Sequence, residues 1–334
     1  MHTADRILEL LYDARGGWLA PEELARRAGP GGGGAELPAG RVTRAIAALR
    51  ERGQRIESSP AHGLRLVRPA RLDAHLIERD LRVNRVGRNV ICFDQVDSTN
   101  DVVLASAAQS GSDGLAVLAE SQRKGRGRLG RRWSSPAGAN ILMSILLKDP
   151  RGVLAHDALT IASGVATAGA VESVCALRCE LKWPNDVLID GAKTAGVLVE
   201  LHGAGRRASA ASGRNIVIGI GVNVNAAPPA GEVDRPATCL ADELGHSVER
   251  IEVARAMLRG LDQWIEKIAR SDLRGLHKAW MDRCGMINRR MAILSEGVRH
   301  VGRVIDVSPL EGLALCRDDG STVWLKACES SVVD

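Results

Sequence analysis

A glycine-spaced basic segment at residues 122–133 is the part of the chain best suited to chemistry on an anion. Its sequence, QRKGRGRLGRRW, places six basic side chains within ten residues and separates them with three glycines. No acidic residue lies between Glu120 and Asp149. Glycine lacks a Cβ, so backbone N–H groups can approach phosphate oxygens, while guanidinium groups donate paired, permanently charged hydrogen bonds. The segment therefore predicts a site for a nucleotide or a nucleic acid.

Two common phosphate-binding motifs partly match the sequence, one within the basic segment and one at Lys193-Thr194. Gly125, Gly127 and Gly130 satisfy the GxGxxG spacing of a dinucleotide site, but the WSSP that follows breaks a helix instead of opening one. A P-loop is excluded because Lys193-Thr194 lacks the glycine that should precede it by several residues. Taken alone, the basic segment is also compatible with a solvated loop.

Two further polar segments follow predicted strands. The DSTN segment at 97–100 begins a predicted helix, which the hydroxyl groups of Ser98 and Thr99 could simply cap. The KWPND segment at 182–186 surrounds a proline turn, and Asn and Asp are also ordinary turn residues. Each segment, by itself, is therefore compatible with a structural role as well as with a functional one.

Two more segments concern neighbouring predicted strands. Asp190-Gly191 predicts a two-residue hairpin turn, which places Lys193 near the start of the returning strand. A lysine on a strand is usually just exposed. In GIGVNV at 219–224, glycines lie inside an apolar strand, where they weaken pairing unless another group approaches the backbone closely.

In this order and spacing, the segments resemble the biotin protein ligase family. The resemblance covers most of residues 80–280, and its motifs are DSTN at 97–100, QxxGRGRxGRxW at 122–133, KWPND at 182–186, KxAGxLVE at 193–200 and GxGxNV at 219–224. The front of the chain resembles the DNA-binding domain of bifunctional members, which act as ligase and as repressor of biotin synthesis. The end resembles the small SH3-like domain of the family.

The resemblance implies a two-step reaction with ATP, biotin and Mg²⁺. The carboxylate of biotin attacks the α-phosphorus of ATP, expels pyrophosphate and forms biotinyl-5'-AMP. A lysine amine of the biotin carboxyl carrier protein of acetyl-CoA carboxylase then attacks the anhydride carbonyl. Because two anions meet in the first step, neutralisation by cations and orientation dominate its barrier. In repressing members biotin also acts as corepressor.

The same resemblance assigns roles to residues of this chain. Arg128 and Lys193 are expected to be catalytic, together with Asp186, which orients the acceptor amine or helps carry Mg²⁺. The residues expected to bind biotin are Ser98, Thr99, Asn100, Gln122, Arg126, Gly127, Arg128, Lys193 and Gly196. The residues expected to bind ATP or the adenylate are Gly125, Arg126, Arg128, Trp133, Asn185 and Asn223.

We predict an α+β protein of three domains. Residues 1–68 form a winged helix-turn-helix, residues 69–284 an α/β catalytic domain of the biotin/lipoate ligase type with a mixed sheet, and residues 285–334 a small SH3-like β-barrel. The strands expected in the central domain are 90–93, 116–119, 141–147, 187–189, 196–201 and 216–224. Its expected helices are 100–109, 158–176, 253–268 and 273–284.

The front domain is expected to contain helices at 5–14, 21–28 and 41–52 and a hairpin at 56–67. An inward stripe of the third helix is formed by Val42, Ala45, Ile46 and Leu49. DNA contacts are expected from Arg41, Thr43 and Arg44. The resemblance also implies operator DNA as a partner and a homodimer on adenylate binding. The loop at 29–40 is much longer than a usual helix-turn-helix turn, so a ligase whose domain no longer represses stays open.

Composition agrees with a soluble, cytoplasmic protein. Hydrophobic residues make up 45% of the chain, and the net charge of +5 permits anionic partners without requiring them. The seven cysteines are scattered, with no CxxC pair and no nearby histidine cluster, so we expect reduced thiols and no structural zinc. No apolar run has the length of a membrane span, so no membrane association is expected.

Two rival functions remain open. A lipoate or octanoate transferase shares the fold class, although the intact GRGRxGRxW segment and Gln122 argue against it. A regulator that senses a small molecule without converting it is disfavoured by the retention of both Arg128 and Lys193.

Overall fold

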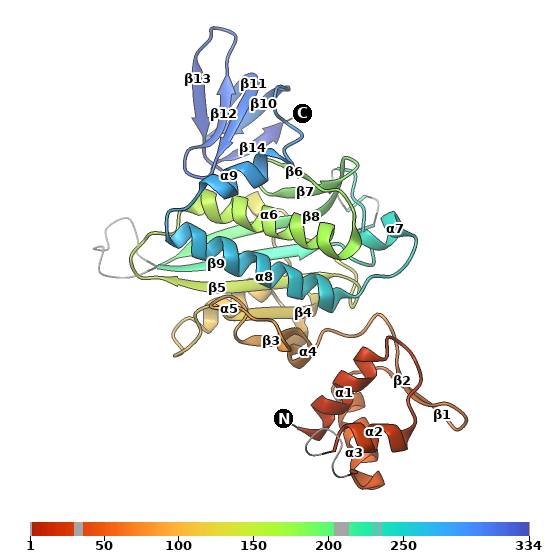
Figure 1. Cartoon of the computed structure of the whole chain (residues 1–334). Coiled ribbons are helices and arrows are strands. Elements are labelled where there is room, and N and C mark those ends of the chain that lie inside the picture. The colour runs from red at the N-terminus through yellow and green to blue at the C-terminus, as the bar shows by residue number, and fades with distance from the viewer. Residues whose placement is uncertain (1, 30–35, 204–213, 230, 233–234, 334) are drawn as a thin grey trace. The chain divides into compact units, whose positions relative to one another are not determined.

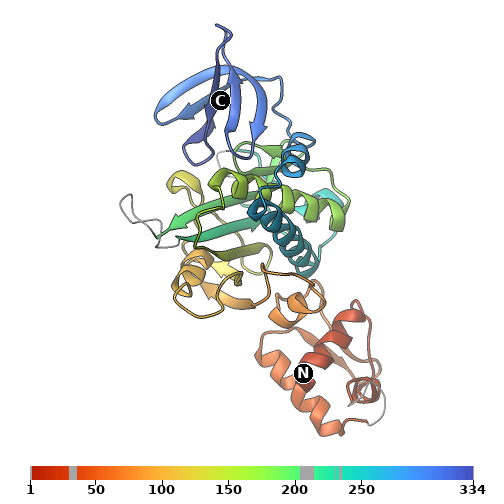
Figure 2. The same cartoon turned by 60° about the vertical axis from the view of Figure 1, so that its left-hand side comes forward.

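The computed structural model describes residues 2–29, 36–203, 214–229, 231–232 and 235–333, arranged in two compact units (Figures 1 and 2). The first unit contains residues 1–79 with 249–251, and the second contains residues 80–248 with 252–334. The middle of the glycine-rich loop expected at 29–40 lies outside the described residues.

Among the described residues 2–29 and 36–79, the first unit contains four helices and a hairpin. Their bounds are α1 Thr3–Asp13, α2 Pro21–Arg27, α3 Ala39–Glu51, β1 Ile56–Ser59, β2 Gly63–Leu66 and α4 Ala74–Glu78. The inward stripe expected on α3 is confirmed, because all four of its side chains are buried and α1 packs against this helix. Arg41, Thr43 and Arg44 are exposed. The short α4 was not expected; its cap is Asp73, which accepts the Leu76 N–H.

A seven-stranded sheet forms the centre of the second unit. Its order is β3-β4-β5-β9-β8-β7-β6. The bounds are β3 Val90–Val96, β4 Ala116–Gln122, β5 Ile141–Asp149, β6 Glu180–Lys182, β7 Asp186–Ile189, β8 Ala192–His202 and β9 Arg214–Val222. Only the β3–β4 pair is parallel among these described strands, so the sheet is mixed, as predicted. Asp190 and Gly191 form the predicted turn between β7 and β8, both with positive φ.

Helices lie on both faces of this sheet. Their bounds are α5 Thr99–Ala105, α6 His156–Cys175, α7 Leu240–Leu244, α8 Arg250–Ala269 and α9 Arg274–Met281. α6 packs against β8, whereas α5 packs against β4, β5 and β9 on the other face (Figures 1 and 2). Val103 of α5 meets Val117, Leu146 and Val217 in a buried cluster. This packing fixes α5, and with it the DSTN segment, on the sheet.

Some expected bounds were wrong. α5 ends at Ala105, not at Gln109, because the following N–H groups bond to carbonyls three residues back in tighter turns. The three-residue β6 and the five-residue α7 were missed, since elements this short leave no periodic pattern. Of the described helices, α6 does have the length and composition of a membrane span, which corrects the expectation that no such run exists. Because 78% of its most apolar stretch is buried, its apolarity reflects packing inside the unit.

The end of the chain forms an antiparallel sheet of five strands in the order β13-β12-β11-β10-β14. The bounds are β10 Arg290–Ser295, β11 Val298–Ser308, β12 Gly312–Cys316, β13 Thr322–Leu325 and β14 Ser330–Val333. A bulge interrupts the β11–β12 register between Val304 and Asp306. The last strand, β14, pairs with β10 and is one of the two edge strands in this order.

A single carboxylate fastens the chain before β3 to α8, and its loss is expected to destabilise the second unit. Asp262 accepts the backbone N–H groups of Asn84, Arg85 and Val86 at 2.7–2.8 Å. In Asp262→Ala these donors lose their acceptor, so the free energy of unfolding in urea should fall by about 2–3 kcal/mol. Asp272→Ala, which changes an exposed residue of the same type, should change it by less than about 0.5 kcal/mol. Equal losses in the two variants would contradict this role for Asp262.

Candidate functional site

A cavity of about 310 Å³ on the sheet of the second unit brings the predicted site residues together. This volume lies at the lower end of the range for small-molecule sites. Every residue assigned to catalysis, biotin or the adenylate in the sequence analysis lines it, with the exception of Gly125. Segments that are far apart in the sequence, from residue 98 to residue 223, thus contribute to one concave surface.

Neutral hydrogen-bonding groups form one part of the cavity wall. The side-chain oxygen of Gln122 accepts the Thr99 N–H at 2.7 Å and the Thr99 hydroxyl at 3.0 Å. The Ser144 hydroxyl lies 2.6 Å from Thr99 Oγ1 and 2.5 Å from Asn100 Oδ1. Asn100 donates to Glu200 at 2.6 Å. These contacts hold the start of α5 against β4, β5 and β8.

The capping role considered for the DSTN segment is wrong for both hydroxyls. Ser98 is the N-cap residue of α5, yet its side chain makes no capping hydrogen bond in the described structure. Thr99 uses its hydroxyl on Gln122 instead. Ser98 is 2% exposed and lines the cavity, so it belongs to the site by position.

The basic segment folds back on itself beside the sheet. Trp133 N–H donates to Gly125 O at 3.0 Å, and Gly127 N–H donates to Arg131 O at 2.7 Å. A Cβ at position 125 would lie 2.5 Å from the carbonyl oxygen of Trp133, so this turn requires glycine. Gly125 therefore shapes the loop and does not itself face the cavity. No α-helix follows within the described residues before α6, which agrees with the rejection of a dinucleotide motif.

The Trp133 indole lies against two glycines of the central sheet. Gly196 of β8 and Gly221 of β9 are register partners, and a Cβ on either would press on the Trp133 ring. A Cβ at Gly219 would press on Asn100 in the same way. This confirms the expectation that another group approaches the glycines of β9. Trp133 Nε1 is buried without a hydrogen-bond partner among the described residues.

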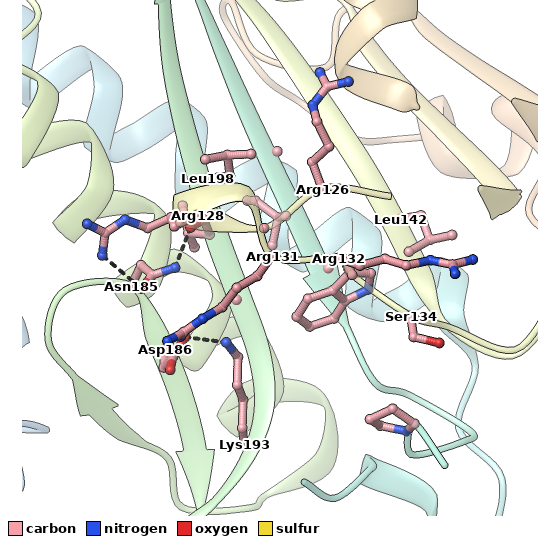
Figure 3. Close-up of a pocket in the computed structure, with 18 of the residues that line it drawn as sticks. Arg126, Arg128, Arg131, Arg132, Ser134, Leu142, Asn185, Asp186, Lys193 and Leu198 are labelled. Atoms are coloured by element: carbon pink, nitrogen blue, oxygen red, sulfur yellow. Dashed lines mark hydrogen bonds and ion pairs between the residues drawn. The ribbon is translucent and has the colours of Figure 1, made fainter. Parts of the chain in front are cut away.

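Several cations of the cavity have partners in this structure, and Figure 3 shows those of Lys193 and Arg128. Arg126 binds both carboxylate oxygens of Asp101, at 2.7 and 2.9 Å. Lys193 Nζ lies 2.5 Å from Asp186 Oδ1, and these two side chains point toward one another. Arg128 points instead toward Asn185, whose Oδ1 accepts from it at 3.4 Å.

The C-terminal strand and the turn before it supply the strongest contacts of Arg128. Its guanidinium donates to the carbonyl oxygen of Ala327 and, at 2.8 Å, to that of Ser330. Burial lowers the pKa of Arg128, and the negative charge of Asp186 partly offsets this effect. The hydrogen bonds that Arg126 donates to Asp101 raise the pKa of Arg126. Both groups remain cationic at neutral pH, because an arginine pKa stays far above it.

Two asparagines of the predicted site hold the backbone of the cavity wall. Asn185 donates to Val197 O at 2.6 Å across the β7–β8 pair. Asn223 donates to Thr238 O at 3.1 Å, while its Oδ1 is buried and unpaired within the described structure. Both side chains therefore position the strands and loops around the cavity.

Several residues of the cavity were not anticipated. They include Ser331 and Val332 of β14, which line it, and the Ala327 and Ser330 carbonyls that hold Arg128. Glu200 and Asp101 also engage Arg126. Every residue has a backbone carbonyl, so a contact through a carbonyl oxygen does not depend on the side-chain type. The sequence therefore could not indicate that Ala327 and Ser330 bind Arg128.

Similarity to known proteins agrees with this geometry. Residues 92–223 match the model of the Biotin/lipoate A/B protein ligase family. Bifunctional ligase/repressor BirA of Escherichia coli (strain K12) is 30% identical over 281 residues, which is 84% of this chain and 84% of that protein. The chain belongs to the biotin/lipoate A/B protein ligase family.

Two further similarities extend this result. Bifunctional ligase/repressor BirA of Bacillus subtilis (strain 168) is 32% identical over 220 residues, 65% of this chain and 66% of that relative. A solved structure of the biotin protein ligase from Aquifex aeolicus, in complex with biotin and ATP, superposes with a TM-score of 0.63 at 26% identity. It covers 74% of this chain and 99% of that one. The part matched to the biotin/lipoate A/B protein ligase family contains most of the cavity but not β14.

In this member of the biotin/lipoate A/B protein ligase family, the contact between Trp133 and the two glycines can be tested by adding a methyl group at Gly221. In Gly221→Ala, the new methyl group occupies space held by the indole, so Trp133 must move off the sheet. We expect a shift in tryptophan emission that disappears when the same substitution is made together with Trp133→Phe. Gly219→Ala, which meets Asn100 instead, is the matched control. An unchanged spectrum in Gly221→Ala would contradict the packing.

Proposed function

We propose that this chain is an ATP-dependent biotin protein ligase. It forms biotinyl-5'-AMP from biotin and ATP and transfers biotin to a lysine of a biotin carboxyl carrier protein of acetyl-CoA carboxylase. The observation that carries this proposal is the shared cavity, in which cationic loop residues and Lys193 lie next to a neutral hydrogen-bonding wall. The similar biotin protein ligase structure from Aquifex aeolicus, which is in complex with biotin and ATP, supports the same substrates.

The neutral wall suits the ureido ring of biotin. That ring has N–H donors and a carbonyl acceptor but no charge, so matched neutral partners bind it best. Ser98, Thr99 and Gln122 offer such groups and are held by the α5–β4 contacts. Asn100 is 6% exposed and packs on Gly219, so it closes the wall behind them.

The cationic side suits the carboxylate and the α-phosphate. Arg126, Arg128 and Lys193 line the cavity beside the backbone of Gly127. When biotin and ATP bind, their oxygens replace Asp101, the two carbonyls and Asp186 as partners of these cations. An exchange of one partner for another keeps each of these cations paired. The biotin carboxylate oxygen then attacks the α-phosphorus, pyrophosphate leaves, and the cations stabilise the charge that develops.

Asp186 has two compatible roles. Its carboxylate lies in the cavity beside Lys193 and offers an oxygen of the kind that Mg²⁺ prefers. Mg²⁺, when bound with ATP, would neutralise phosphate charge. In the second step the same carboxylate orients the incoming lysine amine, which attacks the anhydride carbonyl and releases AMP. Trp133 and Asn223 would border the adenylate close to the paired glycines of β8 and β9, Gly196 and Gly221.

Removal of the charge of Arg128 or of Lys193 tests the catalytic roles proposed for them. We expect Arg128→Ala and Lys193→Ala each to reduce biotin-dependent ATP/pyrophosphate exchange by about 10²-fold or more, because they stabilise charge in the transition state. Arg123→Ala removes an exposed cation of the same loop that pairs with Asp97, and it should retain near-normal exchange. Wild-type exchange rates in both Arg128→Ala and Lys193→Ala would refute the proposed roles. Exchange with lipoate in place of biotin would favour the lipoate branch of the family.

We also propose that the first unit is a winged helix-turn-helix and that the C-terminal sheet is a small SH3-like barrel. Three helices followed by the β1–β2 hairpin have the element order of a winged helix. On α3 the exposed residues Arg41, Thr43 and Arg44 lie outside the buried stripe, where a recognition helix presents its contacts. The unit would then bind operator DNA when the adenylate-bound chain forms a homodimer, with biotin as corepressor.

A gel-shift experiment tests the repressor role. DNA from upstream of biotin synthesis genes should bind the protein more tightly in the presence of biotin and ATP. The double variant Arg41→Ala/Arg44→Ala should weaken this binding by about tenfold or more, because each phosphate or base contact contributes on the order of 1 kcal/mol. Arg27→Ala, an exposed arginine of α2, is the control. Absence of a shift under all conditions, with ligase activity retained, would leave a ligase without repression.

A further inference from the structure

A cluster of three potential metal ligands lies outside the proposed biotin and ATP site. His156, Asp157 and Cys328 each offer one ligand atom, and these atoms all lie within 4.8 Å of one another. The first two residues begin α6, and the third lies in the turn between β13 and β14. None of the three lines the cavity described above. The cluster therefore joins two parts of the second unit that are distant in sequence.

The carboxylate of Asp157 has an unsatisfied oxygen in this cluster. The residue is only 4% exposed. Its Oδ1 accepts the Ala327 N–H at 3.2 Å, whereas its Oδ2 is buried with no hydrogen-bond partner in the part of the chain that the structure describes. A buried carboxylate oxygen without a partner is costly, so a group that would pair with it is expected at this position.

A backbone carbonyl orients the imidazole ring of His156 toward the cluster. Its Nε2 lies 3.2 Å from the carbonyl oxygen of Val199, which can only accept, so Nε2 carries the proton. Its Nδ1 faces Asp157 Oδ1 at 3.2 Å, within the cluster. Metal-binding histidines commonly have this arrangement, with the second ring nitrogen donating to a backbone carbonyl.

We propose that His156, Asp157 and Cys328 bind a divalent transition metal ion of the zinc type. A thiolate, an imidazole and a carboxylate form a mixed donor set that favours zinc over magnesium or calcium. With the thiol proton displaced, two anionic ligands balance the charge of the ion. Three protein ligands leave a fourth tetrahedral position for water. The sequence-based expectation of no zinc site considered only ligands close together along the chain, whereas these ligands meet only in the fold.

An ion bound at this cluster would stabilise the turn whose carbonyl groups hold Arg128. Cys328 follows Ala327, whose carbonyl holds Arg128, and it precedes Ser330, whose carbonyl does the same. Asp157 also binds the N–H of Ala327. A bound ion would therefore fasten α6 to the turn that holds Arg128, without taking part in the adenylation chemistry.

Cobalt substitution of the full-length protein tests the proposal. After dialysis against a chelator, Co²⁺ is added and the absorption spectrum is recorded. We expect about one equivalent to bind with a thiolate-to-metal charge-transfer band and the intense visible bands of a tetrahedral site. Cys328→Ser should abolish the charge-transfer band and weaken Zn²⁺ binding by about 10-fold or more. Cys316→Ser removes a half-buried thiol of the same C-terminal sheet and should leave both unchanged.

A second variant guards against a folding artefact. Asp157→Asn keeps an oxygen for the Ala327 N–H and should keep the far-ultraviolet circular dichroism of the wild type while it loses the tetrahedral bands. Absence of stoichiometric Co²⁺ binding by the wild type would overturn the proposal. So would a charge-transfer band that survives in Cys328→Ser. Neither result bears on the ligase proposal, because ATP/pyrophosphate exchange is measured separately.

Discussion

The close approach of the basic loop to the central sheet is the contact on which the cavity depends. Trp133 can lie on β8 and β9 only because Gly196 and Gly221 are register partners without side chains. Gly125 permits the loop to turn back on the Trp133 carbonyl. Because the indole is fixed at the end of the loop, the basic residues before it lie close to the same strands and line the cavity with them. Glycines in the strands and glycines in the loop thus serve one packing requirement.

Charge balance allows several cations to share a small space. Arg126 is neutralised by Asp101 and Lys193 by Asp186, whereas Arg128 donates to two carbonyl oxygens and keeps its net charge. Each partner belongs to a different element, so these three cations are spread around the cavity, although the charge of Arg131 still acts on Arg128 and contributes to lowering its pKa. An anionic ligand that enters between them can exchange partners one at a time. The arrangement therefore favours a ligand with several separated anionic groups, as ATP has, over one with a single charge.

The sequence predicted the strands well and the partners of the site residues poorly. The six strands expected in the central domain are all present, because buried aliphatic runs such as those of β5 and β9 are typical of central strands. The residues around the cavity could be named because their motifs recur in a known order. What they contact could not be predicted. The carbonyls of Ala327 and Ser330 bind Arg128 through main-chain atoms, and a pairing across about two hundred residues leaves no local pattern.

The contacts of the C-terminal strand show that the cavity depends on residues outside the part matched to the family. The family match ends at residue 223, yet Arg128 is held by β14 and by the turn before it, and the Trp183 indole donates to Ser330 Oγ at 2.9 Å. Ser330 thus contacts both the basic loop and the KWPND segment. The C-terminal sheet therefore sets the position of Arg128 in this structure, although none of its side chains had been expected in the site.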